Sequence, residues 1–139
     1  MAVYSETFEL ATKGEVQGID ITDRVAAVIR RSSLKAGIAC VFAPSSTSAI
    51  VANESDAGVE DDLAAALERA APRRAEYRHE ERWHDGNGHS HVRASLLGQS
   101  FTFPFEGGRP RLGTWQQVWF VELDNKPRTR EVVVTLVGE

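Results

Sequence analysis

The fold is decided by an apolar stretch in the last third of the chain, Trp115-Gln-Gln-Val-Trp-Phe-Val-Glu-Leu123. Residues 118–121 are apolar at every position, and residues 132–134 repeat the pattern. A strand with one face in water alternates apolar and polar side chains, so strands without alternation are covered on both faces. The pattern therefore predicts a sheet that is covered on both sides by helices, by a second sheet or by another subunit.

Other strand-like segments lie on both sides of this stretch. Alternation is clear at Phe101, Phe103 and Phe105, which is typical of a strand with one buried face. The remaining segments are rich in β-branched or aromatic residues and are bounded by turn-forming ones: residues 3–10, 14–19, 37–43, 47–52, 91–97 and 130–137. We expect the second of these to pair back onto the first.

Two segments show helical spacing of their apolar residues. The first covers residues 22–36, and the second covers about residues 59–71 and is closed by Pro72. Residues 72–88 are polar and contain glycine, so we expect a long connection there. The chain is predicted to be a single α+β domain over residues 1–139, with mainly antiparallel sheets and two or three helices.

Composition limits the possible functions. The chain has 139 residues, of which 42% are hydrophobic and 26% charged, and its net charge is -4. This negative charge gives no general attraction to nucleic acid or to anionic lipid. No segment approaches the ~20 apolar residues of a membrane span, and the first residues lack the pattern of a signal peptide. We therefore expect a cytoplasmic protein with neither nucleic-acid nor membrane partners.

The four histidines of the chain are clustered in one short stretch: His79, His84, His89 and His91. Imidazole is a common zinc ligand and titrates near neutral pH, so the cluster indicates a metal or an acid-base site. If residues 89–95 are extended, His89 and His91 project from one face of a strand. His79 could then close a three-histidine site with an open fourth position, as in catalytic zinc sites. His84 is the member that we leave out.

Charged residues near the histidines suggest further roles. Glu54 or Asp85 would handle protons, and Arg93 or Arg130 would contact an anionic substrate. A plainer alternative is a solvated strand face whose histidines merely alternate with a buried face. The glycine-rich loops that bind nucleotide phosphates are absent from the sequence.

Ordered motifs in the second half of the chain resemble those of a known family: Asn87-Gly-His-Ser-His-Val-Arg-Ala-Ser-Leu-Leu-Gly98, Gly107-Gly-Arg-Pro-Arg-Leu-Gly-Thr-Trp-Gln116 and Asn125-Lys-Pro-Arg-Thr-Arg130. With residues 42–50 and Asn53-Glu54 upstream, they closely resemble the YjbQ family over roughly residues 3–139. The resemblance implies a small α+β homotrimer. The family is labelled secondary thiamine-phosphate synthase because some members show weak activity of that kind.

The resemblance also implies which positions of this chain recur as polar residues in the family: Thr47, Glu54, His79, Asn87, His91, Trp115, Gln116 and Arg130, with His89 where His or Asp is frequent. Among these positions we expect Thr47, Asn87, Trp115 and Gln116 to bind substrate, and a position where Asp can replace His is compatible with the divalent metal, zinc in the first place, expected at His79, His89 and His91. Many relatives have His-Thr-Thr where this chain has Ser45-Ser46-Thr47. An imidazole is therefore missing at that turn.

The implied synthase reaction releases pyrophosphate, so it needs cations for the leaving group and a pocket for two rings. Arg93, Arg128 and Arg130 could supply the charge, and Trp115 a platform for a ring. Zinc on three histidines is more usual for activating water, whereas magnesium on carboxylates suits the departure of pyrophosphate. Three hypotheses follow: a thiamine-phosphate synthase acting on small phosphorylated molecules, a zinc-dependent hydrolase of another substrate, and a non-catalytic trimeric ligand-binding protein.

Overall fold

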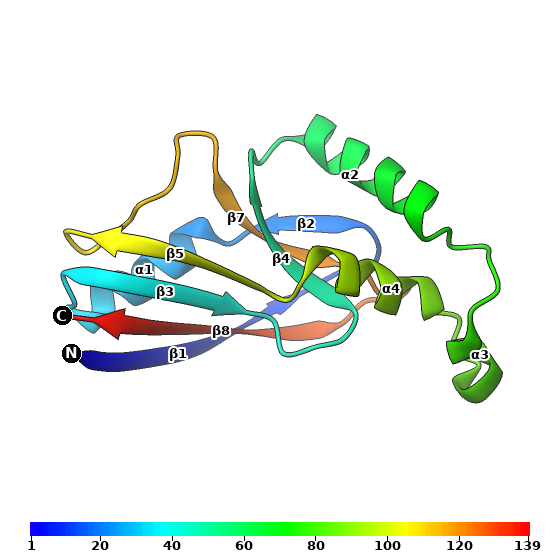
Figure 1. Cartoon of the computed structure of the whole chain (residues 1–139), viewed down its shortest axis with the longest axis horizontal. Helices are drawn as coiled ribbons and strands as arrows, with labels where there is room; N and C mark the ends of the chain where they lie inside the picture. The colour runs from blue at the N-terminus through cyan, green and yellow to red at the C-terminus, as the bar shows by residue number, and fades with distance from the viewer.

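The computed structural model describes residues 1–139 and contains two antiparallel sheets and four helices (Figure 1). The larger sheet has the order β1-β8-β3-β5-β6, and the smaller has β2-β7-β4. The strands are β1 (Ala2–Ala11), β2 (Gln17–Asp20), β3 (Ala36–Phe42), β4 (Ser48–Asn53), β5 (Ser100–Glu106), β6 (Arg109–Pro110), β7 (Gln117–Glu122) and β8 (Thr129–Gly138). The helices are α1 (Thr22–Ser32), α2 (Ala57–Ala70), α3 (Arg78–Trp83) and α4 (Gly88–Leu97).

Strand β7 is buried on both faces, as its sequence predicts. Val118 and Phe120 belong to a core that joins α1 to the inner face of the larger sheet. Trp119 and Val121 point to the other side and pack in a second cluster with Leu67 of α2 and with α4. The smaller sheet is therefore the middle layer of the molecule. One of its faces packs against α1 and the larger sheet, and the other packs against α2 and α4, so both faces are covered by the same chain.

Two expectations about the first third of the chain are wrong. Strand β2 does not pair back onto β1 but lies antiparallel to β7, with Ile19 opposite Phe120. The first helix ends at Ser32 rather than at residue 36, because Ser33 adopts a left-handed backbone with φ 61°. Ala36 is instead the first residue of β3.

The largest correction concerns residues 91–97, which form the helix α4 instead of a strand. In a strand, Val92 and Leu96 would lie on the face opposite His89 and His91 and would be buried, but they are 40% and 60% exposed, whereas Arg93 is 3% exposed. Burial follows a stripe with helical rather than twofold spacing. The connection before α4 also contains the short helix α3, so the chain has four helices and not two or three. No helix combines the length and apolar character that a bilayer crossing needs.

Candidate functional site

Two neighbouring helices bring a pair of histidines together. His79 lies on α3 and His91 on α4, and their ring centroids are 4.3 Å apart. Gly88, the first residue of α4, allows the helices to approach, because a Cβ there would collide with the side chain of Tyr77. Both imidazoles remain partly exposed. The bend between the helices therefore makes a histidine pair that solvent can reach.

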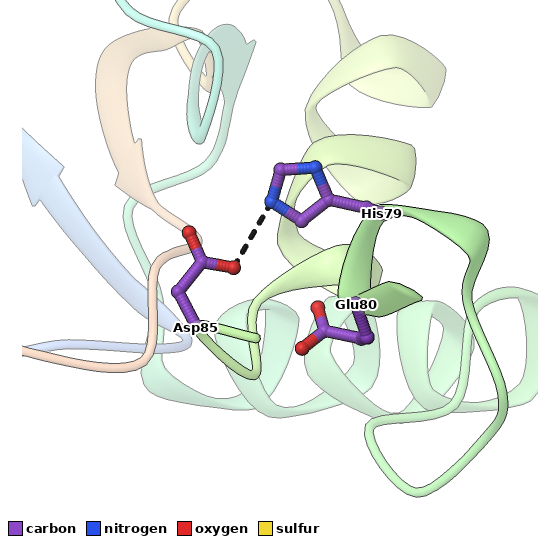
Figure 2. A group of neighbouring side chains, drawn as sticks. All are labelled: His79, Glu80 and Asp85. Atoms are coloured by element: carbon purple, nitrogen blue, oxygen red, sulfur yellow. Dashed lines mark ion pairs between the residues drawn. The ribbon is translucent and has the colours of Figure 1, made fainter. Parts of the chain in front are cut away.

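Asp85 joins the pair from the loop between α3 and α4. Its Oδ1 lies 3.0 Å from Nε2 of His79, and Figure 2 shows the two side chains facing each other. Glu80 is also close, but its two carboxylate oxygens accept hydrogen bonds from the backbone N–H of Gly86 at 2.5 Å and of Gly88 at 2.7 Å. Glu80 thus fixes the loop that presents Asp85.

The side-chain amide of Asn87 lies against this group. In one orientation its nitrogen donates to Oδ1 of Asp85 at 2.8 Å and to Nε2 of His79 at 3.1 Å. In the other orientation the nitrogen donates to Oδ1 of Asp124 at 3.3 Å, and the amide oxygen faces the same two acceptors. Acceptors that face one another repel unless a proton or a cation lies between them. A bound cation would favour the second orientation.

Part of this group is spaced for a divalent metal ion: ligand atoms of His79, Glu80 and Asp85 all lie within 4.8 Å of one another. Zinc bonds of roughly 2.0–2.1 Å place the atoms of a tetrahedral set about 3.3 Å apart, and the His79 to Asp85 distance is 3.0 Å. The ring of His91 lies 4.3 Å from that of His79, so a second imidazole is at hand, and two imidazoles with one carboxylate form a donor set found in catalytic zinc sites. Asn87 would add a neutral oxygen.

The group opens onto a hollow of about 470 Å³. The opposite wall is built from the turn between β3 and β4, from the connection between β7 and β8, and from the start of β8: Ser45, Ser46, Thr47, Asp124, Arg128 and Arg130. This wall lies at one end of the smaller sheet, where Ser48 of β4 is paired with Glu122 of β7. The hollow therefore lies between that sheet end and the two short helices.

A buried ion pair supports the wall. Glu122 is fully buried and accepts hydrogen bonds from Arg130 Nε at 2.8 Å and Nη2 at 2.6 Å. The Thr12 hydroxyl donates to the same carboxylate at 2.6 Å, and the N–H of Asp124 donates at 3.1 Å. Arg130 also donates to the Thr47 hydroxyl at 2.8 Å. The charge of Arg130 is therefore matched by Glu122 before any substrate arrives.

Arg128 is held less completely. Its Nε and Nη2 both donate to Oδ2 of buried Asp124, at 3.1 and 2.7 Å. The remaining nitrogen, Nη1, has no partner in the chain, and the side chain is 37% exposed. Burial alone would raise the pKa of Asp124, but hydrogen bonds from Asn125 N–H and from Arg128 outweigh it and lower that pKa. Asp124 is thus an ionised anchor that leaves one edge of Arg128 free.

The surroundings of His91, which lines the hollow, favour the neutral form of its imidazole. Burial lowers the pKa of His91 below its ordinary value, and the neighbouring His79 lowers it further. Since ordinary histidine is already mostly neutral at pH 7, His91 keeps a lone pair available there. A metal ion would not have to displace a proton from it.

The structure brings some predicted site residues together and separates others. Those that line the hollow are Thr47, His79, Asp85, Asn87, His91 and Arg130. His89 does not, because residues two apart in a helix point about 200° apart. The expectation that His89 and His91 share one face is therefore wrong. His89 is 1% exposed, and its Nε2 lies 2.7 Å from Oε2 of Glu15.

Arg93 is also committed elsewhere. Its Nε donates to the carbonyl of Ala71 at 3.0 Å, and its Nη2 lies 2.7 Å from Oε2 of Glu68. With 3% exposure it fastens α4 to the end of α2. The side chain of Arg93 is therefore not available for the contact with an anionic substrate that the sequence suggested. His84 ends α3, is exposed and does not line the hollow.

Three predicted residues lie at the far end of the smaller sheet. Glu54 follows β4, and Trp115 and Gln116 precede β7; the pairing of Asn53 with Gln117 places all of them together. The hollow is at the other end of the same two strands, about 20 Å away for strands of this length. Trp115 is 70% exposed, and the Gln116 side chain accepts from Gly113 N–H at 2.8 Å.

Sequence reasoning missed several residues that line the hollow or support its wall from behind. Glu122 and Asp124 were not singled out, although carboxylates at the end of a strand apolar on both faces need buried partners. Arg128 was considered as a source of positive charge for a leaving group, and its pairing with Asp124 was not foreseen. Trp83 lines the hollow and is 62% exposed. The signal in the sequence is that two acidic residues precede the Asn125-Lys-Pro turn and two basic residues follow it.

Comparison with known proteins agrees with this architecture. The family model described as UPF0047 protein YjbQ-like matches residues 6–139. A UPF0047 protein of Methanothermobacter thermautotrophicus is 42% identical over 100% of this chain and 95% of its own length. The UPF0047 protein YugU of Bacillus subtilis is 33% identical over 96% of this chain and 98% of its own.

Solved structures give the same result. A YbjQ-like protein of unknown function from Sulfolobus solfataricus superimposes with a TM-score of 0.89 at 31% identity, covering 99% of this chain and 100% of that one. An uncharacterised YjbQ/UPF0047 protein from Clostridium acetobutylicum gives 0.87 at 37% identity, covering 95% and 99%. The fold expected from the resemblance is confirmed, and the chain belongs to the YjbQ-like UPF0047 family.

Proposed function

We propose that this protein is a divalent-metal-dependent enzyme that hydrolyses a small phosphorylated substrate, with zinc held by His79, His91 and Asp85. The observation that carries the proposal is the convergence of two imidazoles and a carboxylate at the edge of an open hollow. This ligand set replaces the three-histidine set expected from the sequence, since His89 faces Glu15.

Zinc in such a set lowers the pKa of a bound water and polarises a phosphoryl oxygen. The chain supplies the rest of the site. The free Nη1 of Arg128 and the side chain of Ser46 belong to the wall of the hollow, where they suit phosphate oxygens, whereas the Ser45 hydroxyl is already hydrogen-bonded to that of Ser48. Asp124 orients both Arg128 and Asn87. These groups would hold the substrate across the hollow from the histidines.

Charge favours hydrolysis over the release of pyrophosphate. Arg130 and Arg128 are already paired with Glu122 and Asp124, so the hollow has little free positive charge for a pyrophosphate leaving group. Thiamine-phosphate synthase is the second candidate. It is favoured by the exposed ring of Trp83, which offers a platform for a heterocycle. The oxygen donors of Asp85 and Asn87 would also suit magnesium.

The proposal predicts that activity depends on the metal and on Asp85. Asp85→Asn removes the charged ligand and is expected to lower kcat/KM for phosphate monoesters by about 100-fold. Glu81→Gln, an exposed carboxylate of the same segment, is the matched control and should retain activity. The measurements are metal analysis of untagged protein and turnover before and after chelation and zinc addition.

The outcomes separate the candidates. Protein that carries no metal, or turnover that survives chelation, would sink the metal-dependent proposal. Formation of thiamine phosphate with magnesium, without hydrolysis of monoesters, would select the synthase. Zinc-dependent stability without any turnover would leave a ligand-binding protein.

We also propose that the protein works in the cytoplasm as a homotrimer. The face of the larger sheet opposite its core carries a row of side chains in register, formed by Val3, Val137, Ile38 and Pro104. Val3 is 72% exposed, Ile38 54% and Val137 39%. An apolar row of this kind on a sheet face is typical of a surface that another subunit covers.

Ile38→Glu is expected to weaken self-association by at least about tenfold, because it would bury a charge at the centre of this row. Sedimentation velocity over a range of concentrations measures the effect. Leu96→Glu makes the same change at an exposed position of α4 and is the control. A wild-type protein that sediments as a monomer, or an Ile38→Glu trimer of unchanged stability, would refute the assignment of this face.

A further inference from the structure

A second hollow, of about 770 Å³, lies between α1 and the turn that joins β5 to β6. Figure 1 shows this turn at the end of the molecule away from α3, so the hollow is separate from the histidine site. The volume lies within the range of about 300–1,000 Å³ that small-molecule sites occupy. Its walls are one side of α1, the residues that follow α1, and the β5 to β6 turn.

The lining carries positive charge only. Its charged residues are Arg30, Lys35 and Arg109, and no carboxylate lines the hollow. All three are exposed, and none of their side chains has a hydrogen-bond or ion-pair partner in the chain. This segregation stands out in a chain with a net charge of -4. Three unpaired cations around one concave surface attract an anion.

The floor of the hollow is apolar. Ala26 and Ile29 of α1 and Leu34 and Leu112 of the surrounding loops line it. A hydrated inorganic ion would gain nothing from these side chains, whereas the apolar part of an organic molecule would. The combination therefore selects a ligand with both an apolar body and an anionic group.

The C-terminal end of α1 has little free negative charge that would repel an anion in this hollow. The C-terminal carbonyls of a helix carry partial negative charge. Here the carbonyl of Ile29 accepts a hydrogen bond from the Ser32 hydroxyl at 2.6 Å, and that of Arg30 accepts one from Ser33 N–H at 3.2 Å. The exposed negative potential at this end is reduced by these bonds.

A peptide strand is a poor occupant of this hollow. Strand β6 lies at the edge of the larger sheet, but Pro110 has no N–H to offer a neighbouring strand. The next N–H, of Arg111, is already donated to the carbonyl of Pro104 at 2.9 Å. Strand addition is therefore disfavoured, and a small molecule remains.

We propose that this hollow binds a small organic anion, in which Arg30, Lys35 and Arg109 hold a carboxylate, sulfonate or phosphate group and the floor holds an apolar body. The site is independent of the proposed metal-dependent activity. It would serve a substrate or an effector that differs from the ligand of the histidine hollow.

Titration calorimetry on the full chain, in the presence of chelator, tests the proposal with naphthalene-2-sulfonate as the probe. We expect saturable binding, with at least about tenfold weaker binding of neutral 2-naphthylmethanol and of inorganic sulfate. The double variant Lys35→Glu/Arg109→Glu should weaken sulfonate binding by at least about tenfold. Both positions are exposed, so the fold should tolerate the change.

Two controls locate the binding. Arg74→Glu reverses an exposed charge outside the lining and should leave the affinity unchanged. Asp85→Asn should also leave it unchanged, so the result does not depend on the metal site. Absence of saturable binding, equal affinity for the neutral alcohol, or an unaffected double variant would overturn the proposal.

Discussion

His91→Ala is expected to lower the zinc affinity by about 100-fold or more while leaving the fold intact, whereas His89→Ala is expected to keep zinc binding and lose stability. The two residues lie on one helix but face opposite ways. His91 is partly exposed beside His79, and His89 is buried against Glu15. Titration calorimetry with zinc measures the first effect, and thermal melts with and without chelator measure the second.

The loss of stability in His89→Ala has a definite cause. Glu15 is 10% exposed and would lose its contact with Nε2 of His89, leaving Arg73 as its partner at 3.1 Å. A buried carboxylate deprived of one partner, together with the cavity left by the imidazole, costs roughly 3 kcal/mol of unfolding free energy. This loss should persist in chelator, because it arises from packing and not from metal.

His84→Ala is the matched control for both histidine variants. It removes an exposed imidazole at the end of α3 and should change neither zinc affinity nor the melting temperature. If His89→Ala abolished zinc binding as completely as His91→Ala, the ligand set proposed from α3 and α4 would be refuted. Equal stability of the three variants in chelator would refute the buried role of His89.

The strands were predictable because their side chains follow a local rule. Residues 118–121 are apolar on both parities, and the structure buries both faces of β7. The pairing of β2 was not predictable in the same way. Residues 14–19 are close in sequence to β1, but the partner that completes the smaller sheet is β7, about a hundred residues later. Partner choice depends on which edge is free, and sequence spacing does not encode that.

Helix α4 shows why the candidate site was only half predicted. Its buried side includes Gly88, His89, Ser90 and Arg93, so the buried face of this helix is not an apolar face. Ser90, Val92, Ala94 and Leu96 are spaced two residues apart, and three of them are apolar. This twofold spacing in the sequence favours a strand. Tertiary partners reverse this preference, because Glu68 satisfies the charge of Arg93 and Glu15 pairs with His89. The clustering of His79 and His91 was visible in the sequence, but the direction of each ring was not.

The largest effect on stability is expected at Arg130. Arg130→Ala leaves the Glu122 carboxylate, which is fully buried, without its ionic partner and without two of its hydrogen bonds. Removing one member of a buried ion pair destabilises a protein by roughly 3–5 kcal/mol. Chemical denaturation of the variant measures the loss. The same substitution at Arg111, which pairs with Glu106 where both side chains are about two-thirds exposed, should cost less than about 1 kcal/mol.

A second change separates the charge from the shape of the wall. In Glu122→Gln/Arg130→Met the unpaired charge is gone and most of the volume is kept, so much of the stability lost in Arg130→Ala should return. The Thr12 hydroxyl, which donates to the Glu122 carboxylate, can donate equally to an amide oxygen at that position. A double variant as unstable as Arg130→Ala would show that the hydrogen bonds of the guanidinium, and not the burial of an uncompensated carboxylate, hold this end of β7 against β8. The hollow would then depend on donor geometry more than on charge.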